Sequence, residues 1–523
     1  EFIPLMYGNE VYELMRDVKR VWDAESIFNV GKIVDAPPMD SNLRFEVKPE
    51  YAFEKVLKND KTYFNWKAAF DECDVKGATG AKSQLHALMC SIEQCNGAGD
   101  CRKSNLIGGT LCPAYKVSRD ETHTTRARAN VLREVLTRGW ESEAFDGAIK
   151  VNKALWDIEE IDEVLNSCLS CKGCRSECPS NVDMTRLKAE ILQQRYDSKR
   201  MPFRSFMVSR MVQVERFGRM VTPLYNFFAT WRPSAMVIKR ILRFAIERDI
   251  PNLSRHTMRQ LVAREQSNCG VDGKERVVNL FADEFTNFQE AELGLSFARL
   301  LMALGYVVRV PKHVESGRAA ISKGCLKYAK RCAEKNVELL SDVVTSDAPL
   351  VGIEPSCLLS FRDEYPDLVD SKMRDRAKGL AKNVYLFDEF IVREMEAGRI
   401  TAGMFDDGAV EIWLHGHCHQ KSLVGIDKTV KMLGLLRGAK VNVIPSGCCG
   451  MAGSFGYEAE HYKTSLAIGE MVLFPAVRRV VPTTSGVVPT IVAAPGTSCR
   501  QQIKDGTGVV AVHPIEILAD ALE

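Results

Sequence analysis

The chain has 523 residues, of which 46% are hydrophobic and 26% charged, and its formal net charge is +2. This composition excludes a disordered or collagen-like chain, and the balanced charge gives no indication of a nucleic-acid partner. The length suits three to four domains, at about 150 residues each. No apolar run of 18 residues occurs, so no membrane-spanning helix is expected.

Cysteine is the unusual component, with 17 residues in the chain. Several cysteines have only two or three residues between them, and Cys448 and Cys449 are adjacent. Such spacing suits metal binding or redox chemistry better than a framework of disulfides. We therefore expect a reducing, cytoplasmic compartment.

The first 270 residues divide into four predicted segments, the last of which is residues 201–270. Residues 1–35 have helical spacing over 11–22 and resemble the end of a domain, so we expect the sequence to be part of a longer polypeptide. Residues 36–80 are predicted to be a linker. Residues 81–200 hold eight cysteines and two helical patterns, over 125–138 and 184–196.

Residues 201–270 are predicted to form a basic helical connector. Eleven Lys or Arg stand against two Glu between positions 199 and 248, interleaved with aromatic residues. Solvated helices that pack on neighbours explain this pattern. A surface for an anionic membrane or an acidic partner is the alternative.

Residues 271–523 alternate short β-rich runs with helical stretches, which predicts parallel α/β structure. The runs cover residues 277–281, 306–310, 350–353, 410–414, 441–444, 490–494 and 509–512. A strand, a turn and a cysteine recur at Cys357 and Cys499, so we expect an internal duplication with copies at 271–395 and 396–523. The predicted fold class is mixed, with an all-α helical domain followed by a duplicated, Rossmann-like α/β pair.

The strongest motif is a C-x2-C-x2-C-x3-C-P run, which is typical of bacterial ferredoxins and consists of Cys168, Cys171, Cys174 and Cys178. Three thiolates from one tight loop can each bind a different iron of a [4Fe–4S] cube. The fourth, before a proline, turns to a neighbouring cluster. Cys112, also before a proline, is the expected fourth ligand of the first cube. Zinc is the alternative metal.

A second cluster in the same region is less certain from the motif. Cys95 and Cys101 are six positions apart, matching the first and third cysteines of the regular run, but the middle position is Ala98. With Cys178 they give three thiolates. A [3Fe–4S] cluster, a cube with a non-cysteine ligand, Cys90 as a substitute, and no cluster at all remain open.

The C-terminal part carries another group of cysteines, each after a predicted strand: Cys418, Cys448, Cys449 and Cys499. Loops at the carboxyl ends of parallel strands converge, so these thiols are expected to meet. They could bind an iron–sulfur cluster or zinc, or form a redox disulfide. The first copy keeps only Cys357. This cysteine is expected, at most, to contribute a ligand to the site formed by the second copy. The remaining unpatterned cysteines are interpreted as structural: Cys73, Cys269, Cys325 and Cys332.

These motifs resemble the paired cysteine-rich CCG domains found in heterodisulfide reductase and in the iron–sulfur subunits of glycolate oxidase and anaerobic glycerol-3-phosphate dehydrogenase. The sequence is more similar to fused bacterial FAD-linked oxidases of the D-2-hydroxyglutarate/D-lactate dehydrogenase type. That similarity rests on Cys95 and Cys101 with their glycines, on Cys112, and on residues 125–130. Phe28, Gly31 and Lys32 resemble the tail of the FAD-linked oxidase domain, although Val30 replaces the usual proline.

The resemblance implies a helical two-cluster ferredoxin domain followed by a CCG pair, and an FAD domain upstream of residue 1. It implies an oxidoreductase that oxidises a 2-hydroxyacid (D-2-hydroxyglutarate, D-lactate or glycolate) and passes electrons from FAD to a quinone or a carrier protein. Catalytic residues are expected outside this sequence. We also expect a homo-oligomer, located in the cytoplasm or at the inner face of the membrane. A thiol–disulfide redox protein of the heterodisulfide reductase kind and a zinc-binding assembly module are the alternatives.

Overall fold

The computed structural model describes residues 2–38, 41, 62–67, 81–141, 159–266, 276–480 and 488–522. It divides the chain into two compact units, Glu1–Ala52 and Phe53–Glu523. The first unit contains α1 (Phe2–Tyr7) and α2 (Asn9–Trp22), which confirms the predicted helix. Neither helix has a buried residue, and Leu14 and Trp22 of α2 are exposed. Most of the predicted linker, including Cys73, lies outside the described residues.

The second unit begins with short helices around the cysteine motifs: α3 (Ala81–Glu93), α4 (Pro113–Ser118), α5 (Thr125–Glu141), α6 (Glu159–Asn166), α7 (Gly173–Glu177) and α8 (Met184–Ser198). Helices α5 and α8 confirm the two predicted helical patterns. Asp183 begins α8, because its side chain accepts hydrogen bonds from the backbone N–H groups of Thr185 and Arg186. The described residues of this region contain no strand.

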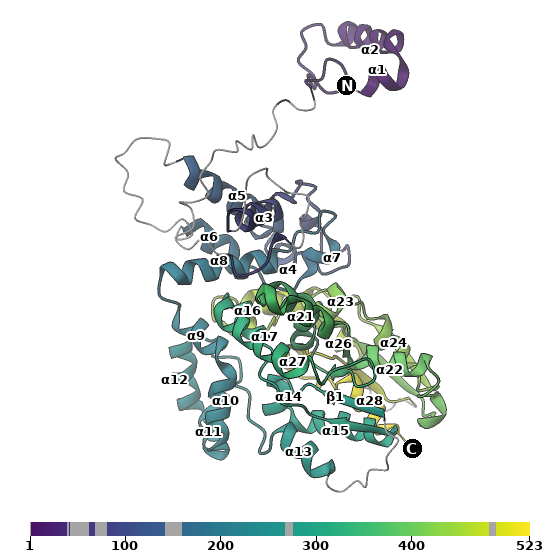
Figure 1. The fold of residues 1–523 in the computed structure, drawn as a ribbon. Coiled ribbons are helices and arrows are strands. Elements are labelled where there is room, and N and C mark those ends of the chain that lie inside the picture. Colours follow the sequence, from purple (N-terminus) through teal and green to yellow (C-terminus); the bar gives the residue numbers. More distant parts are fainter. Residues whose placement is uncertain are drawn as a thin grey trace. The chain divides into compact units, whose positions relative to one another are not determined.

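The basic connector is helical, as predicted, and contains α9 (Phe203–Ser209), α10 (Met211–Arg219), α11 (Thr222–Thr230), α12 (Arg232–Leu242) and α13 (Met258–Gln266). Helices α9 to α12 lie side by side at one edge of this unit (Figure 1). They are held to its body by Val212 and Leu253, which pack with Phe288 and Tyr225.

A four-stranded parallel sheet follows, in the order β2-β1-β3-β4. Its strands are β1 (Arg276–Leu280), β2 (Tyr306–Arg309), β3 (Leu350–Gly352) and β4 (Val384–Leu386). The register pairs Val277 with Val307, and Val351 with Tyr385. The helices between and after these strands are α14 (Glu284–Phe288), α15 (Ala291–Ala303), α16 (Arg318–Ser322), α17 (Leu326–Leu340), α18 (Pro355–Leu358), α19 (Ser360–Asp363), α20 (Tyr365–Leu368), α21 (Arg374–Ala381) and α22 (Phe387–Glu396).

A second parallel sheet has three strands in the order β6-β5-β7. Its strands are β5 (Val410–Leu414), β6 (Ala439–Val443) and β7 (Thr490–Ala493). Of the predicted last strand only Val512 pairs, through an isolated parallel bridge to Ala493. The accompanying helices are α23 (Cys418–Leu423), α24 (Asp427–Leu433), α25 (Tyr462–Met471), α26 (Leu473–Val480), α27 (Thr497–Thr507) and α28 (Pro514–Asp520).

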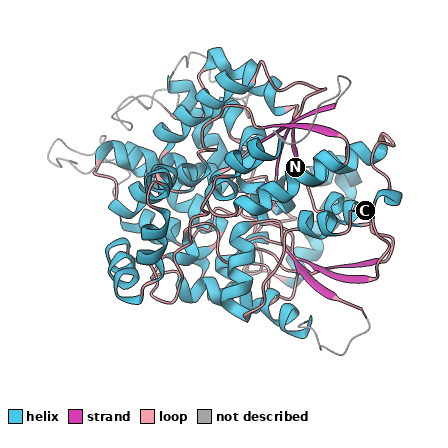
Figure 2. Cartoon of the chain, turned by 90° about the horizontal axis from the view of Figure 1, so that it is seen from below, coloured by secondary structure: helices cyan, strands magenta, loops and turns pink. Residues whose placement is uncertain are grey.

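One hydrophobic core joins the two sheets. It contains Val278 and Leu280 of the first sheet, Ile412 and Leu414 of the second, and side chains of the helices packed between them. Figure 2 shows the strands as two separate groups within a much larger mass of helices.

The predicted fold class is wrong. The structure has two small and unequal parallel sheets within a chain that is mainly helical, instead of an all-α domain followed by two matching Rossmann-like domains. The strands are only three to five residues long, and helices and loops occupy most of the chain between them. Short apolar runs predict where strands occur, but not the size of the sheet that they form. Among the described residues, no helix is both long and apolar enough to cross a membrane.

Candidate metal centres

Four cysteines of the helical region come together around the loop that leads into α7, as their mutual charge interactions show: Cys112, Cys168, Cys171 and Cys174. Ser170 and Lys172 have φ values of 56° and 63°, so this loop turns tightly through two left-handed positions. Burial raises the pKa of the Cys174 thiol, and nearby negative charge raises it further. The structure therefore brings together the residues predicted for the first [4Fe–4S] cluster.

A buried arginine lies against this group. Arg128 of α5 is 1% exposed, and its guanidinium donates to Cys112 Sγ at 3.3 Å, to the Val164 carbonyl at 2.8 Å and to Ser167 Oγ at 2.7 Å. Burial alone would raise the pKa of Cys168, but the positive charges of Arg128 and Lys188 overcome it and lower that pKa. Arg128 therefore offsets the negative charge that thiolates bring into this interior.

The second group of ferredoxin cysteines is only partly assembled. Burial raises the pKa of Cys101, and the charges of Cys112 and Cys95 act in the same direction, so Cys95 and Cys101 lie near one another. Cys178 ends α7, where its backbone N–H donates to the Cys174 carbonyl at 3.2 Å. The assignment of Cys95, Cys101 and Cys178 to one cluster stays a prediction.

The C-terminal cysteines converge from three neighbouring strands. Cys418 begins α23 after β5, Cys448 and Cys449 follow β6, and Cys499 lies in the first turn of α27 after β7. All four are buried. Because β5 is paired with both β6 and β7 in parallel, their carboxyl ends meet at one edge. The structure thus brings together the four thiols that chain order alone predicts to meet.

Hydrogen bonding among these thiols lowers the pKa of two of them and raises the pKa of the other two. A hydrogen bond from Cys448 lowers the pKa of Cys418 to about 7. Hydrogen bonds from Cys448 and Cys499 lower the pKa of Cys449 well below its usual range. The same contacts raise the pKa of Cys448 and Cys499. A buried group of four thiols, two of which favour the thiolate, has the donor chemistry that iron–sulfur clusters and zinc require.

Backbone shape makes room for this group. Gly496 approaches it so closely that an added Cβ would lie 2.4 Å from His417 Cδ2 and 3.3 Å from Cys499 Sγ. Gly450 has a φ of 98° and donates its N–H to Cys448 Sγ at 3.4 Å. A side chain at Gly496 would displace the histidine or the thiol beside it, and one at Gly450 would collide with the Ser465 carbonyl oxygen, 2.3 Å from the added Cβ.

His415 and Ser446 belong to the same site. His415 follows β5 directly and is fully buried, and its Nδ1 lies 2.6 Å from Ser446 Oγ. Burial lowers the pKa of His415 to about 4, so the imidazole is neutral at neutral pH. A ring nitrogen of His415 and the sulfurs of Cys449 and Cys499 all lie within 4.8 Å of one another. The histidines after β5 are visible in the sequence, but Ser446 carries no signal there.

Cys357 has acidic surroundings, and its helix α18 packs against α23, which begins with Cys418. It is fully buried in α18, and its pKa is raised first by burial and then by the negative charges of Glu284, Asp283 and Glu354. A thiolate there would face three carboxyl groups, which is an unfavourable setting for a metal ligand without a compensating cation. The assignment of Cys357 to the predicted set stays a prediction.

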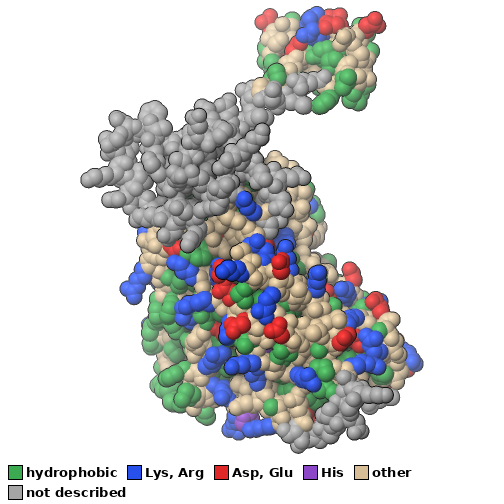
Figure 3. Space-filling model, in the orientation of Figure 1, with side chains coloured by type: hydrophobic (Ala, Val, Ile, Leu, Met, Phe, Trp, Pro, Cys, Tyr) green, Lys and Arg blue, Asp and Glu red, His purple; other side chains and the backbone are tan. Residues whose placement is uncertain are grey.

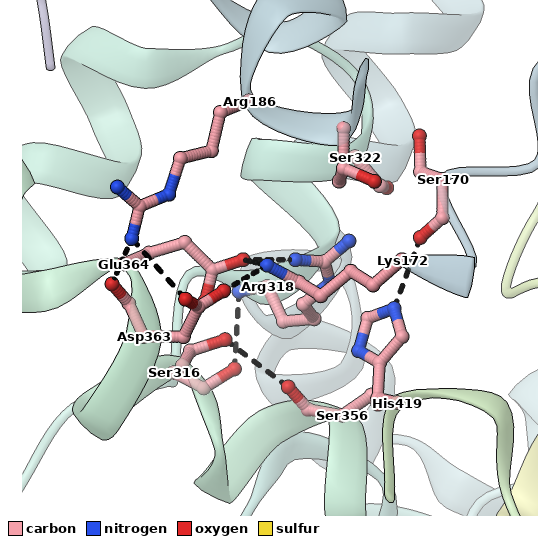
Figure 4. Close-up of polar contacts among 12 residues, drawn as sticks. Ser170, Lys172, Arg186, Ser316, Arg318, Ser322, Ser356, Asp363, Glu364 and His419 are labelled. Atoms are coloured by element: carbon pink, nitrogen blue, oxygen red, sulfur yellow. Dashed lines mark hydrogen bonds and ion pairs between the residues drawn. The ribbon is translucent and has the colours of Figure 1, made fainter. Parts of the chain in front are cut away.

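The two main cysteine groups are close neighbours. His419 Nε2 lies 3.0 Å from the Ser170 carbonyl oxygen (Figure 4), which joins the loop after β5 to the ferredoxin loop. Burial raises the pKa of Cys171, and the second contribution is the negative charge of Cys418. Gly447 lies against the ferredoxin side, where an added Cβ would come within 2.7 Å of the Gly109 carbonyl oxygen.

A buried ionic network fixes the ferredoxin loop to the first sheet's helices. Lys172 is 1% exposed, and its ammonium group forms ion pairs with Asp363 and Glu364, the latter with 2.6 Å between Nζ and Oε1. The guanidinium of Arg318 also pairs with Glu364, at 2.7 Å (Figure 4). Burial would raise the pKa of Asp363, but the charge of Lys172 overcomes it and lowers that pKa. Lys172 therefore neutralises carboxylates. Nothing in the sequence indicates Asp363 or Glu364 as its partners.

Of the four cysteines that belong to no motif, the structure describes two. Cys325 and Cys332 are buried near methionine and tyrosine side chains, in keeping with a structural role. Cys269, like Cys73, lies outside the described residues.

Comparisons with known proteins agree with this picture. Residues 94–183 match the family described as 4Fe-4S dicluster domain. The chain is 25% identical over its whole length to D-2-hydroxyglutarate dehydrogenase of Escherichia coli K12, and 24% identical over 99% of its length to that of Pseudomonas putida KT2440. It is also 27% identical, over 69% of its length and 87% of the relative, to a subunit of anaerobic glycerol-3-phosphate dehydrogenase of E. coli K12.

The chain spans about half the length of the D-2-hydroxyglutarate dehydrogenases that it matches. No solved structure gives a significant match. These findings confirm the resemblance to the iron–sulfur, CCG-type part of FAD-linked oxidases. They support iron–sulfur clusters and an electron-transfer role in an oxidoreductase.

Proposed function

We propose that this chain carries electrons from a reduced flavin to a terminal acceptor through two adjacent metal centres. The observation that carries the proposal is the contact between the two cysteine groups, where the charge of Cys418 acts on Cys171 and His419 meets the Ser170 carbonyl. Electron transfer between buried centres needs short separation and little rearrangement, and a rigid, buried contact provides both.

The first centre is a [4Fe–4S] cluster bound by Cys112, Cys168, Cys171 and Cys174. The second is bound by the converging thiols Cys418, Cys448, Cys449 and Cys499. In both places the protein's own contribution is to exclude water, supply thiolates and set the reduction potential through hydrogen bonds and buried charge. Cys95, Cys101 and Cys178 are proposed to hold a further cluster on the ferredoxin side.

The electron source is proposed to be FAD, reduced by oxidation of a 2-hydroxyacid such as D-2-hydroxyglutarate, D-lactate or glycolate. Support comes from the similarity to D-2-hydroxyglutarate dehydrogenases along the whole chain. Residues 1–35 are proposed to be the tail of the flavin domain, and the exposed apolar residues of α2 suit packing against such a neighbour. The acceptor is proposed to be a quinone or a carrier protein.

Metal analysis of the full chain, purified without oxygen, tests the proposal. We expect iron and acid-labile sulfide, and Cys174→Ser should lose about four iron atoms per chain, the content of one [4Fe–4S] cluster. Cys325→Ser is the matched control, since it removes a buried cysteine outside both groups and should keep the iron. A protein without iron, or one with only zinc, would refute electron transfer. In the holoenzyme with its flavin part, a 2-hydroxyacid should reduce the clusters.

A further inference from the structure

His415 has an unused nitrogen in the interior of the second centre. The residue follows the central strand β5 and is fully buried. Nδ1 is occupied by Ser446 Oγ at 2.6 Å, whereas Nε2 has no hydrogen-bond partner among the described residues. The ring interacts with the Cys449 thiol, but a thiol is only a weak hydrogen-bond partner, so this buried nitrogen favours a stronger ligand.

The nearest candidate partner is whatever the neighbouring thiols bind. A ring nitrogen of His415 and the sulfurs of Cys449 and Cys499 lie within 4.8 Å of one another, from three different loops. Metal–nitrogen bonds of about 2.0–2.1 Å and metal–sulfur bonds of about 2.3 Å let such donors share one metal atom. The hydrogen bond to Ser446 matches a general feature of metal-binding histidines, whose second ring nitrogen is held by a partner that fixes the tautomer and the ring.

We propose that His415 is a metal ligand through Nε2, so that the second centre has a mixed nitrogen and sulfur donor set that includes Cys449 and Cys499. Ser446 is then a positioning residue. The inference rests on the proposed function only in that a metal is bound by these thiols. None of the similarities described above indicates a histidine ligand.

The donor set has a consequence for the potential of the centre. An imidazole is neutral and a thiolate is negative, so a site with one imidazole stores one negative charge fewer than an all-cysteine site. Replacement of cysteine by histidine ligands raises the reduction potential of iron–sulfur clusters. One histidine ligand would therefore raise the potential of the second centre above that of an all-cysteine site, which favours electron flow toward it from the ferredoxin cluster.

Pulsed EPR of the reduced full chain, labelled with ¹⁵N-histidine, tests the ligand directly. We expect a strongly coupled histidine nitrogen in the wild-type protein that is lost in His415→Ala. If the second centre holds zinc, the zinc-edge X-ray absorption of the same protein should show imidazole scattering that the variant lacks. His417→Asn is the matched control, because asparagine can still cap α23 and the residue lies in the same loop; it should keep the signal.

Two outcomes would overturn the inference. One is a wild-type protein without a histidine nitrogen on any metal, a result that does not depend on the folding of a variant. The other is a nitrogen signal that survives in His415→Ala. His415→Cys supplies a second readout, because it replaces the neutral donor by a thiolate and should lower the midpoint potential while the metal content is kept. Failure of the proposed function would instead appear as loss of iron and sulfide from the whole chain.

Discussion

Arg128 sets the charge balance of the ferredoxin cysteines, and its replacement gives a direct test. Arg128→Met removes the donor to Cys112 and leaves the Val164 carbonyl without its partner in the interior. Breaking a buried charged contact costs about 3–5 kcal/mol. We expect a lower iron content and, in the cluster that remains, a lower midpoint potential by redox titration, because the reduced and more negative cluster loses a nearby cation.

Arg126→Met is the matched control for this change. Arg126 lies on the same helix but pairs with the partly exposed Glu121, where ion pairs contribute little. Its loss should leave the potential near that of the wild-type protein. An equal shift in both variants would mean that general surface charge, and not the buried guanidinium, tunes the cluster.

Asp283 is expected to make stability fall as the pH rises. Burial, followed by the charges of Glu354 and Glu284, raises the pKa of this carboxyl to about 8. The folded protein therefore holds a proton that the unfolded chain releases near pH 4, so folding is favoured at low pH and loses stability between about pH 4 and 8. The slope is at most about 1.4 kcal/mol per pH unit.

Asp283→Asn removes this titration but keeps the oxygen that accepts from the backbone N–H groups of Phe285 and Thr286. Thermal unfolding should show a gain for the variant over the wild-type protein that is small at pH 5 and grows steadily up to pH 8. Asp342→Asn, at an exposed side chain, should follow the wild type at both values. A constant difference across this range would contradict the assignment to Asp283.

At the scale of elements, the two cysteine groups depend on loops that touch backbone to backbone. In Gly447→Ala the new Cβ would lie 2.7 Å from the Gly109 carbonyl oxygen and 3.1 Å from Thr110 Cα, so the loops must separate. Overpacking of this kind costs about 1–3 kcal/mol. We expect a lower melting temperature and, in stopped-flow reduction of the holoenzyme, slower electron transfer between the two centres.

Gly379→Ala is the control, because its Cβ on α21 would meet nothing within 4 Å. It should melt at the same temperature or slightly higher, since alanine favours helix over glycine. Unchanged transfer kinetics in Gly447→Ala would show that this contact does not set the spacing of the centres.

The elements also show what the sequence could and could not predict. Apolar runs marked six of the seven strands, but β4 is only three residues long and has no pattern of its own. The convergence of Cys418, Cys448, Cys449 and Cys499 was predictable because parallel strands end at one edge. The acidic surroundings of Cys357 were not, because they depend on carboxyl groups from the loops after β1 and β3, which meet only in the folded chain. Sheet size depends on the same long-range contacts.

At the scale of the second unit, buried and exposed surfaces have opposite characters. Its interior holds cysteines and an ionic network whose charges are paired. The connector, in contrast, exposes large apolar side chains on α10, α11 and α12, among them Phe217, Leu224, Phe227, Phe228, Trp231, Val237 and Ile241. Figure 3 shows hydrophobic side chains gathered over these helices, with Lys and Arg side chains beside them.

This surface is expected to bind an anionic membrane. Phe227 and Trp231, each about half exposed, stack with ring centroids 5.7 Å apart, so a rigid aromatic pair faces outward. Basic residues next to an apolar helical face give the two attractions that hold an interfacial helix, apolar insertion and attraction to anionic lipid. A membrane contact would also bring the metal centres to a membrane-borne quinone, the acceptor that we propose.

Sedimentation of the full chain with lipid vesicles measures this binding. The protein should sediment with vesicles that contain phosphatidylglycerol, bind pure phosphatidylcholine weakly, and dissociate as salt increases, because salt screens the attraction between charges. Phe227→Ser together with Trp231→Ser should reduce binding at least tenfold. Val510→Ser removes a still more exposed apolar side chain outside the connector, and this variant should bind as the wild type does. A chain that binds neither kind of vesicle would indicate that the surface binds an acidic protein partner instead. An equal loss of vesicle binding in the double variant and in Val510→Ser would contradict a localised membrane site.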